Sequence, residues 1–187
     1  MLRRSEVLAN PYFNLVQEEA AESGSVYAFL PAHGESRVGA VQQPLSRAWS
    51  EDLGLSVLLA DLDGSPASLG QPLGDWMESA RRRYDVVTAD LTRVPEELGL
   101  EVMHSATSIF IVSDSDRESL ELARDKAAWI GSHGMEDRCG LLLRGASAGM
   151  RPDLAEDFTG IPVCSLIDTT LQIKRLAAWL TPDVVHA

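Results

Sequence analysis

The chain has 187 residues, of which 45% are hydrophobic and 24% are charged, the ordinary balance of a soluble folded protein. Its formal net charge of -12 predicts a surface that repels nucleic acid and anionic membranes. No apolar run approaches the length of a membrane span, and the two cysteines lack metal-ligand spacing. We therefore expect a cytoplasmic protein with two buried free thiols, no nucleic-acid partner and no stable membrane insertion.

Short apolar strands alternate with amphipathic helices along most of the chain. We expect residues 1–24 to form an N-terminal leader or helix, 25–182 a single domain and 183–187 a C-terminal tail. Strands are expected at 26–30, 56–60, 85–89, 108–112, 139–143 and 162–166, and helices at 41–52, 75–83, 95–104, 116–132, 152–158 and 168–180. This alternation predicts a three-layer α/β/α sandwich with a mostly parallel, doubly wound sheet, whose ligands bind at the carboxyl ends of the strands.

A glycine loop follows the first predicted strand and opens the first predicted helix. Residues 34–39 read GESRVG, with the glycine spacing of the phosphate-binding motif G-x-x-x-x-G-K-Ser/Thr. In that motif backbone N–H groups hold the phosphates, the lysine reaches the β- and γ-phosphates and the hydroxyl binds Mg²⁺. We expect the two glycines to make the turn, although both chemical residues are missing. The residues of this degenerate loop are Gly34, Glu35, Arg37, Gly39, Ala40 and Val41.

Aspartates end the next two predicted strands. Asp61 and Asp63 follow the second strand, and Asp90 follows the third. Because the carboxyl ends of parallel strands share one edge of a sheet, we expect all three near the glycine loop. They either cap loops and helices or retain a metal-binding role, and the pattern leaves both interpretations open.

The segments SVLLADLDG, YDVVTADLT and ATSIFIVSDSDRESLELARDKAAWI, together with the glycine loop, resemble the ParA/MinD-type (deviant Walker) P-loop ATPases and their relatives, the bacterial polysaccharide tyrosine autokinases. The resemblance implies a P-loop NTPase-like fold. It also implies that Asp61 orients or activates the attacking water or hydroxyl, with Asp63 and Asp90 near Mg²⁺. By the same pattern Glu35 stands in place of the signature lysine.

Two further positions depart from the family pattern and decide the expected function. Ala40 replaces the phosphate-binding lysine and Val41 the Mg²⁺-binding hydroxyl, although phosphoryl transfer depends on positioned positive charge. We expect a pseudo-ATPase without a cofactor, acting as a regulatory, positioning or scaffold protein in polysaccharide export, pilus or polar assembly. Intact relatives commonly dimerise, so we expect a homodimer or a protein partner. The alternative is an ATPase or kinase that binds Mg²⁺ and ATP through unusual residues.

A second alternative belongs to another class of enzyme. Residues 145–149 read GASAG and fit G-x-S-x-G, the nucleophile elbow of serine hydrolases, with Ser147 as the nucleophile. Asp168 or Asp183 and His186 follow in the order that a catalytic triad requires. However, an elbow needs a helix directly after the serine, and Pro152 indicates a later helix start.

Overall fold

The computed structural model describes residues 23–34, 38–60, 62, 72–146 and 148–181. Six strands and six α-helices alternate along these residues, with one π-helical turn and one 3-10 turn. The elements are β1 (Ser25–Pro31), α1 (Gly39–Arg47), η1 (Ala48–Asp52), β2 (Val57–Ala60), α2 (Leu73–Arg81), β3 (Val86–Asp90), α3 (Glu96–Ser105), β4 (Ser108–Asp114), α4 (Arg117–Ser132), η3 (Glu136–Arg138), β5 (Cys139–Arg144), α5 (Pro152–Thr159), β6 (Val163–Leu166) and α6 (Thr170–Leu180).

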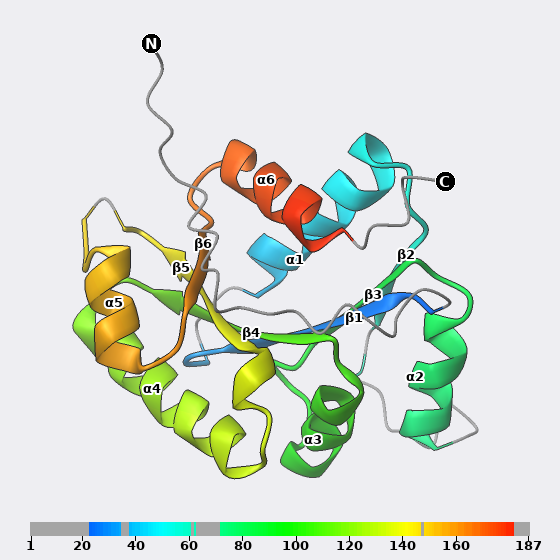
Figure 1. The fold of residues 1–187 in the computed structure, drawn as a ribbon, viewed down its shortest axis with the longest axis horizontal. Coiled ribbons are helices and arrows are strands. Elements are labelled where there is room, and N and C mark those ends of the chain that lie inside the picture. Colours follow the sequence, from blue (N-terminus) through cyan, green and yellow to red (C-terminus); the bar gives the residue numbers. More distant parts are fainter. Residues whose placement is uncertain (1–22, 35–37, 61, 63–71, 147, 182–187) are drawn as a thin grey trace.

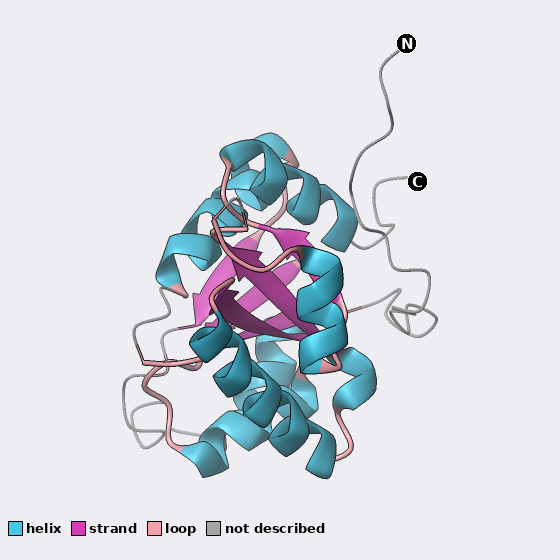
Figure 2. Cartoon of the chain, turned by 90° about the vertical axis from the view of Figure 1, so that its left-hand side faces the viewer, coloured by secondary structure: helices cyan, strands magenta, loops and turns pink. Residues whose placement is uncertain are grey.

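The six strands form one sheet in the order β2-β3-β1-β4-β5-β6, and every neighbouring pair is parallel. Helices α1 and α6 cover one face, whereas α2, α3, α4 and α5 cover the other (Figure 1). A view turned by 90° shows the sheet between the two helical layers (Figure 2). The three-layer α/β/α sandwich with a parallel, doubly wound sheet is therefore confirmed, and each predicted strand and helix is present within about two residues of its expected ends.

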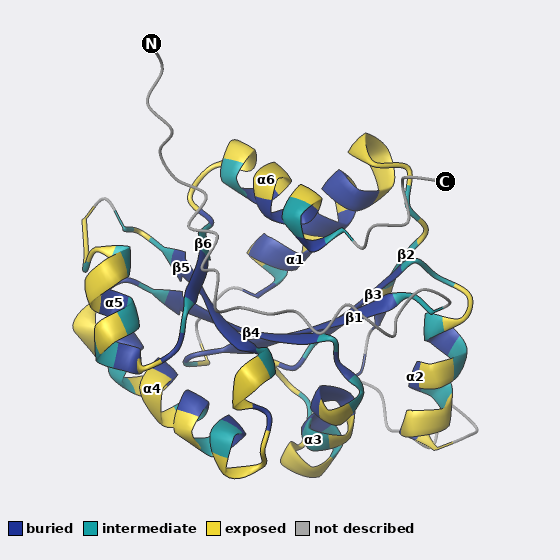
Figure 3. Ribbon diagram, in the orientation of Figure 1, coloured by how far each residue is buried: buried dark blue, intermediate teal, exposed yellow. Residues whose placement is uncertain are grey.

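The alternation of side chains along β1 divides the core into two clusters. Tyr27 and Phe29 pack with α1, η1 and α6, while Val26, Ala28 and Leu30 pack with the helices of the opposite face. All of β1 is buried, as expected for a central parallel strand. Figure 3 shows the central strands buried and the outer faces of the helices exposed. None of the described helices is long and apolar enough to cross a membrane.

The first helix differs in detail from its prediction. It begins at Gly39, so Pro44 lies in its second turn rather than its first, and the carbonyl of Ala40 loses its usual helical donor. Ala40 is exposed, which leaves this carbonyl open to water. The predicted last turn is π-helical because the Leu53 amide donates to the Ala48 carbonyl, five residues back. Trp49 on this turn is fully buried.

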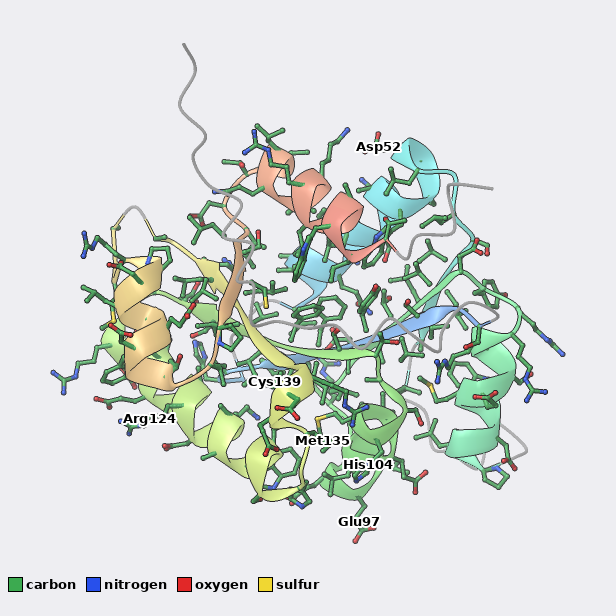
Figure 4. All side chains as sticks on the ribbon, in the orientation of Figure 1. Asp52, Glu97, His104, Arg124, Met135 and Cys139 are labelled. Carbon is green, nitrogen blue, oxygen red and sulfur yellow. The ribbon has the colours of Figure 1, made fainter. Side chains whose placement is uncertain are left out.

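Both cysteines are buried free thiols, as the sequence predicts. Cys139 lies with Met135 on the sheet face that α3 and α4 cover (Figure 4). Burial raises the pKa of Cys139 to about 12 and raises that of Cys164 further. Since the thiolate is the nucleophile, both thiols should stay neutral and inert in the native protein at pH 8.

We therefore expect native protein at pH 8 to give almost no reaction with Ellman's reagent, and both thiols to react once guanidinium unfolds the chain. The measurement is absorbance at the released thionitrobenzoate band. Rapid modification of either cysteine under native conditions would contradict the burial of these side chains.

Candidate functional site

The carboxyl ends of the strands bring the predicted site residues to one edge of the sheet. β1 lies between β3 and β4, so the loop after β1 is flanked by the loops after both neighbours. The chain reverses its direction of winding at this strand, which is where ligands of parallel sheets bind. His33 and Gly34 follow β1, Asp90 ends β3 and Asp114 ends β4.

The described part of the glycine loop shows what its two unusual residues do. Ala40 lies exposed in the first turn of α1 and carries no polar group. Val41 is 1% exposed and packs into the core cluster with Leu45 and Trp49. Val41, which replaces the hydroxyl residue of the phosphate-binding motif, is thus part of the core. Ala40, which replaces the lysine, exposes only a methyl group to solvent.

That Gly34 and Gly39 make the turn stays a prediction, because residues 35–37 between them lie outside the described residues. The described geometry does not itself demand glycine at either position. Neither Gly34 nor Gly39 has a positive φ, and a Cβ built on either residue would meet no heavy atom within 4 Å. An alanine could therefore take the same backbone angles at both positions. Glu35 and Arg37 lie outside the described residues.

Substitution at the two neighbouring positions should separate their roles. Ala40→Lys should change the free energy of unfolding by less than about 0.5 kcal/mol because the side chain is exposed. Val41→Thr should lower it by about 1–2 kcal/mol because a hydroxyl enters the core. Urea unfolding followed by circular dichroism checks both. Equal effects of the two substitutions would show that Val41 has no special place in the core.

Of the three aspartates that the sequence predicts at the ends of the second and third strands, the structure describes Asp90 alone. Its Oδ1 accepts hydrogen bonds from the amide and the hydroxyl of Thr92, which holds the start of the loop between β3 and α3. Asp61 and Asp63 lie outside the described residues, on either side of the buried Leu62. Within the described ranges, no group of three His, Cys, Asp or Glu side chains is placed to hold a metal ion.

The end of β4 carries polar residues that the sequence analysis did not single out. Asp116 caps α4, where its carboxylate accepts hydrogen bonds from the hydroxyl and the amide of Ser119. These bonds, together with the nearby positive charge of His33, hold the pKa of Asp116 below its usual value. The spacing Asp116-x-x-Ser119 before an apolar helix is the local signal that could have predicted this cap.

Arg144 ends β5 at the same edge of the sheet. Its Nε lies 3.6 Å from Oδ1 of Asp114, so the guanidinium joins the ends of β5 and β4. Both side chains remain partly exposed, which limits the contribution of this pair to stability. The pair gives Arg144 a structural partner.

The G-x-S-x-G segment has structural reasons for its two glycines. Gly145 has φ +68°, and a Cβ on Gly149 would lie 1.9 Å from the hydroxyl oxygen of Ser115. The Ser115 hydroxyl donates to the Gly145 carbonyl, and the Ser115 backbone carbonyl accepts a hydrogen bond from the Met150 amide. The loop therefore packs closely on the end of β4, and this packing by itself accounts for the two glycines.

The surroundings of this segment also differ from a nucleophile elbow. Helix α5 begins at Pro152, five positions after Ser147, as the sequence analysis expects. Asp168 accepts a hydrogen bond from the Gly145 amide, so its Oδ1 already holds the loop. Ser147, Asp183 and His186 lie outside the described residues.

Solved structures with the same arrangement of elements identify the fold. A ParA family ATPase from Chlorobium tepidum TLS matches with a TM-score of 0.65 and 15% identity over 85% of this chain and 93% of its own. The septum site-determining protein MinD with Mg-ADP from Pyrococcus horikoshii OT3 matches with a TM-score of 0.67 and 13% identity over 84% and 96%. The MinC:MinD cell division protein complex of Aquifex aeolicus matches with a TM-score of 0.66 and 10% identity over 88% of this chain and 98% of its own.

The chain has the ParA/MinD fold. No protein-family model matches it, and no curated protein is similar to it in sequence. At identities of 10 to 15% these structures show the fold alone. At the phosphate-loop position that the sequence analysis expects, which runs from the loop after β1 into the first turn of α1, this chain has Ala40 and Val41 in that first turn.

Proposed function

We propose that this protein is a pseudo-ATPase, a non-hydrolysing relative of the ParA/MinD ATPases that acts through contacts with other proteins. The observation that carries the proposal is the burial of Val41 in the core beside an exposed Ala40. Neither side chain can contact a phosphate with a charge or bind Mg²⁺ through an oxygen. The loop keeps the strand-to-helix connection and lacks the groups that the reaction requires.

The electrostatics of phosphoryl transfer support this proposal. Catalysis of this reaction comes mainly from cations and N–H donors positioned around the transferring phosphoryl group. The loop has lost the lysine at position 40, and Glu35 adds a negative charge where a second lysine stands in intact relatives. A triphosphate entering this loop would therefore meet less attraction and more repulsion than in an intact phosphate loop.

A role in protein contacts agrees with the surface charge and with one of the related structures. The net charge of -12 disfavours nucleic acid as a partner. The structure from Aquifex aeolicus contains MinD in complex with MinC. For this chain we propose a regulatory, positioning or scaffold role, with a homodimer or another protein as the binding partner, in polysaccharide export, pilus or polar assembly.

Phosphate release from Mg²⁺ and ATP tests the proposal on the full chain. We expect no release above the protein-free background, and we expect the mass from light scattering to be the same with and without Mg²⁺-ATP. Asp61→Asn serves as the control for contaminating ATPases. Turnover that disappears in Asp61→Asn would establish the alternative of an active ATPase with unusual residues.

A further inference from the structure

A cleft is lined by residues of α3 and α4. Both helices lie on the sheet face that also carries α2 and α5 (Figure 1). Its volume is about 580 Å³, which lies within the range of small-molecule sites. Its inner part is formed by the buried side chains of Leu30 in β1, Ala32 directly after β1 and Leu91 directly after β3. Ala32 begins the loop that leads to the glycine loop, and none of the described residues from Gly34 to Val41 lines the cleft, so the cleft adjoins the glycine loop without including it.

Two helical stripes form the walls of the cleft. Side chains three or four residues apart lie on one face of a helix, and the lining residues follow this spacing on both helices. Leu122 on the α4 wall is 40% exposed, although it is a large apolar side chain. The stripe of α3 is Glu96, Gly99 and Met103, and the stripe of α4 is Leu122, Lys126 and Trp129.

Gly99 widens the cleft at the middle of the α3 stripe. It is buried, yet a Cβ built on it would meet no heavy atom within 4 Å. The missing side chain therefore leaves open space rather than a tight backbone contact. A Cβ at this position would enter that open space on the α3 wall of the cleft.

Lys126 is a positively charged residue in the wall of the cleft that α4 forms. Its side chain is half-buried and has no hydrogen-bond or ion-pair partner among the residues that the structure describes. The neighbouring Asp125 lies 3.7 Å from Arg124, whose guanidinium also lies over the ring of Phe158. An anion in the cleft would give this ammonium a charge-assisted partner.

Two carboxylates that line the cleft, those of Glu96 and Asp125, disfavour a ligand with several negative charges. Glu96 lies in the first turn of α3, where the helix dipole stabilises a negative charge, and it lines the same cleft. Together with Asp125 it would repel a ligand with several negative charges. A polyphosphate therefore fits poorly, whereas a single anionic group can reach Lys126.

We propose that this cleft binds a small amphipathic monoanion, with its apolar body against Met103, Leu122 and Trp129 and its carboxylate or sulfonate at Lys126. The apolar body gains by leaving water, and the anionic group pairs with the ammonium of Lys126. This proposal does not depend on whether the phosphate-loop position binds a nucleotide.

Titration calorimetry of the full chain with decanoate, below its micelle-forming concentration, tests the proposal. We expect saturable binding at a single site. Lys126→Gln should weaken it about tenfold, and decanol should bind the wild-type protein about as weakly as decanoate binds that variant. Gly99→Leu should abolish binding by filling the cleft. Lys174→Gln is the matched control, because Lys174 pairs with Asp52 in the other helical layer.

The folding of each variant is checked by circular dichroism. Leucine has a higher helix propensity than glycine and its Cβ meets no atom here, so Gly99→Leu should fold. If it does not fold, Lys126→Gln still decides the result. Absence of saturable binding, or equal affinity of Lys126→Gln and wild type, would overturn the proposal.

Discussion

Trp49→Ala should lower the free energy of unfolding by about 3–5 kcal/mol, the usual loss for a large aromatic side chain in a core. Trp49 is 0% exposed and stacks on Tyr27, with ring centroids 5.3 Å apart and planes 14° apart. Its indole N–H donates to the Ala177 carbonyl at 3.0 Å. The side chain therefore joins η1, β1 and α6, and its removal leaves a cavity among all three.

The same contacts give the end of α6 its hydrogen-bond partners. The last carbonyls of a helix lack donors within the helix. The Tyr27 hydroxyl donates to the Leu180 carbonyl, and burial raises the pKa of Tyr27 to about 12. Since Trp49 packs on Tyr27, its loss should also loosen this end of the helix.

Urea unfolding monitored by circular dichroism measures the effect of Trp49→Ala. Leu171→Ala on α6 is the control, since Leu171 is 58% exposed, and it should change stability by less than about 0.5 kcal/mol. A loss of less than about 1 kcal/mol in Trp49→Ala would contradict the described packing of α6 on β1.

Gly24→Ala is expected to cost about 3 kcal/mol, at the upper end of the range for overpacking. A Cβ on Gly24 would lie 1.9 Å from the Tyr84 carbonyl oxygen and 2.9 Å from that of Asp85, and both are backbone atoms. The Gly24 amide donates to the Arg81 carbonyl, and the Arg81 guanidinium donates back to the Gly24 carbonyl. These bonds fix the backbone at the start of β1, so it cannot move away from the added methyl group.

Thermal and urea unfolding of Gly24→Ala should be compared with those of Gly74→Ala. Gly74 lies within α2 and its Cβ would meet no atom within 4 Å, so alanine there should stabilise the protein by up to about 1 kcal/mol. Equal stability of Gly24→Ala and wild type would show that β1 and β3 do not approach each other as described.

The order of strands and helices was predictable because each element carries its own local pattern. The continuous apolar run of β1 and the apolar stripe of α4 are examples, and both occur at their expected places. The contacts that close the fold were not predictable. Trp49 and Ala177 are 128 positions apart, and the two residues of the Tyr27–Leu180 bond are 153 apart. No local pattern contains such pairs.

The sequence predicts where the candidate site lies better than it predicts what its residues do. The sequence predicts the loop between β1 and α1 at the carboxyl edge of the sheet, and Ala40 and Val41 follow that loop in the first turn of α1. The sequence does not predict which of the two side chains faces the core. A valine at position 41 is equally consistent with the loss of a Mg²⁺-binding hydroxyl and with a residue of the core. The cleft at Gly99 and Lys126 also gives no local signal, since it depends on the spacing of two helices.

Calorimetric titration of the full chain with Mg²⁺ and ATP tests the central claim most directly, with an intact MinD as the positive control. Because Ala40 offers no charge and Val41 is part of the core, we predict no heat beyond dilution at millimolar nucleotide. Saturable binding of Mg²⁺-ATP would contradict the claim that the loop between β1 and α1 no longer serves to hold phosphate.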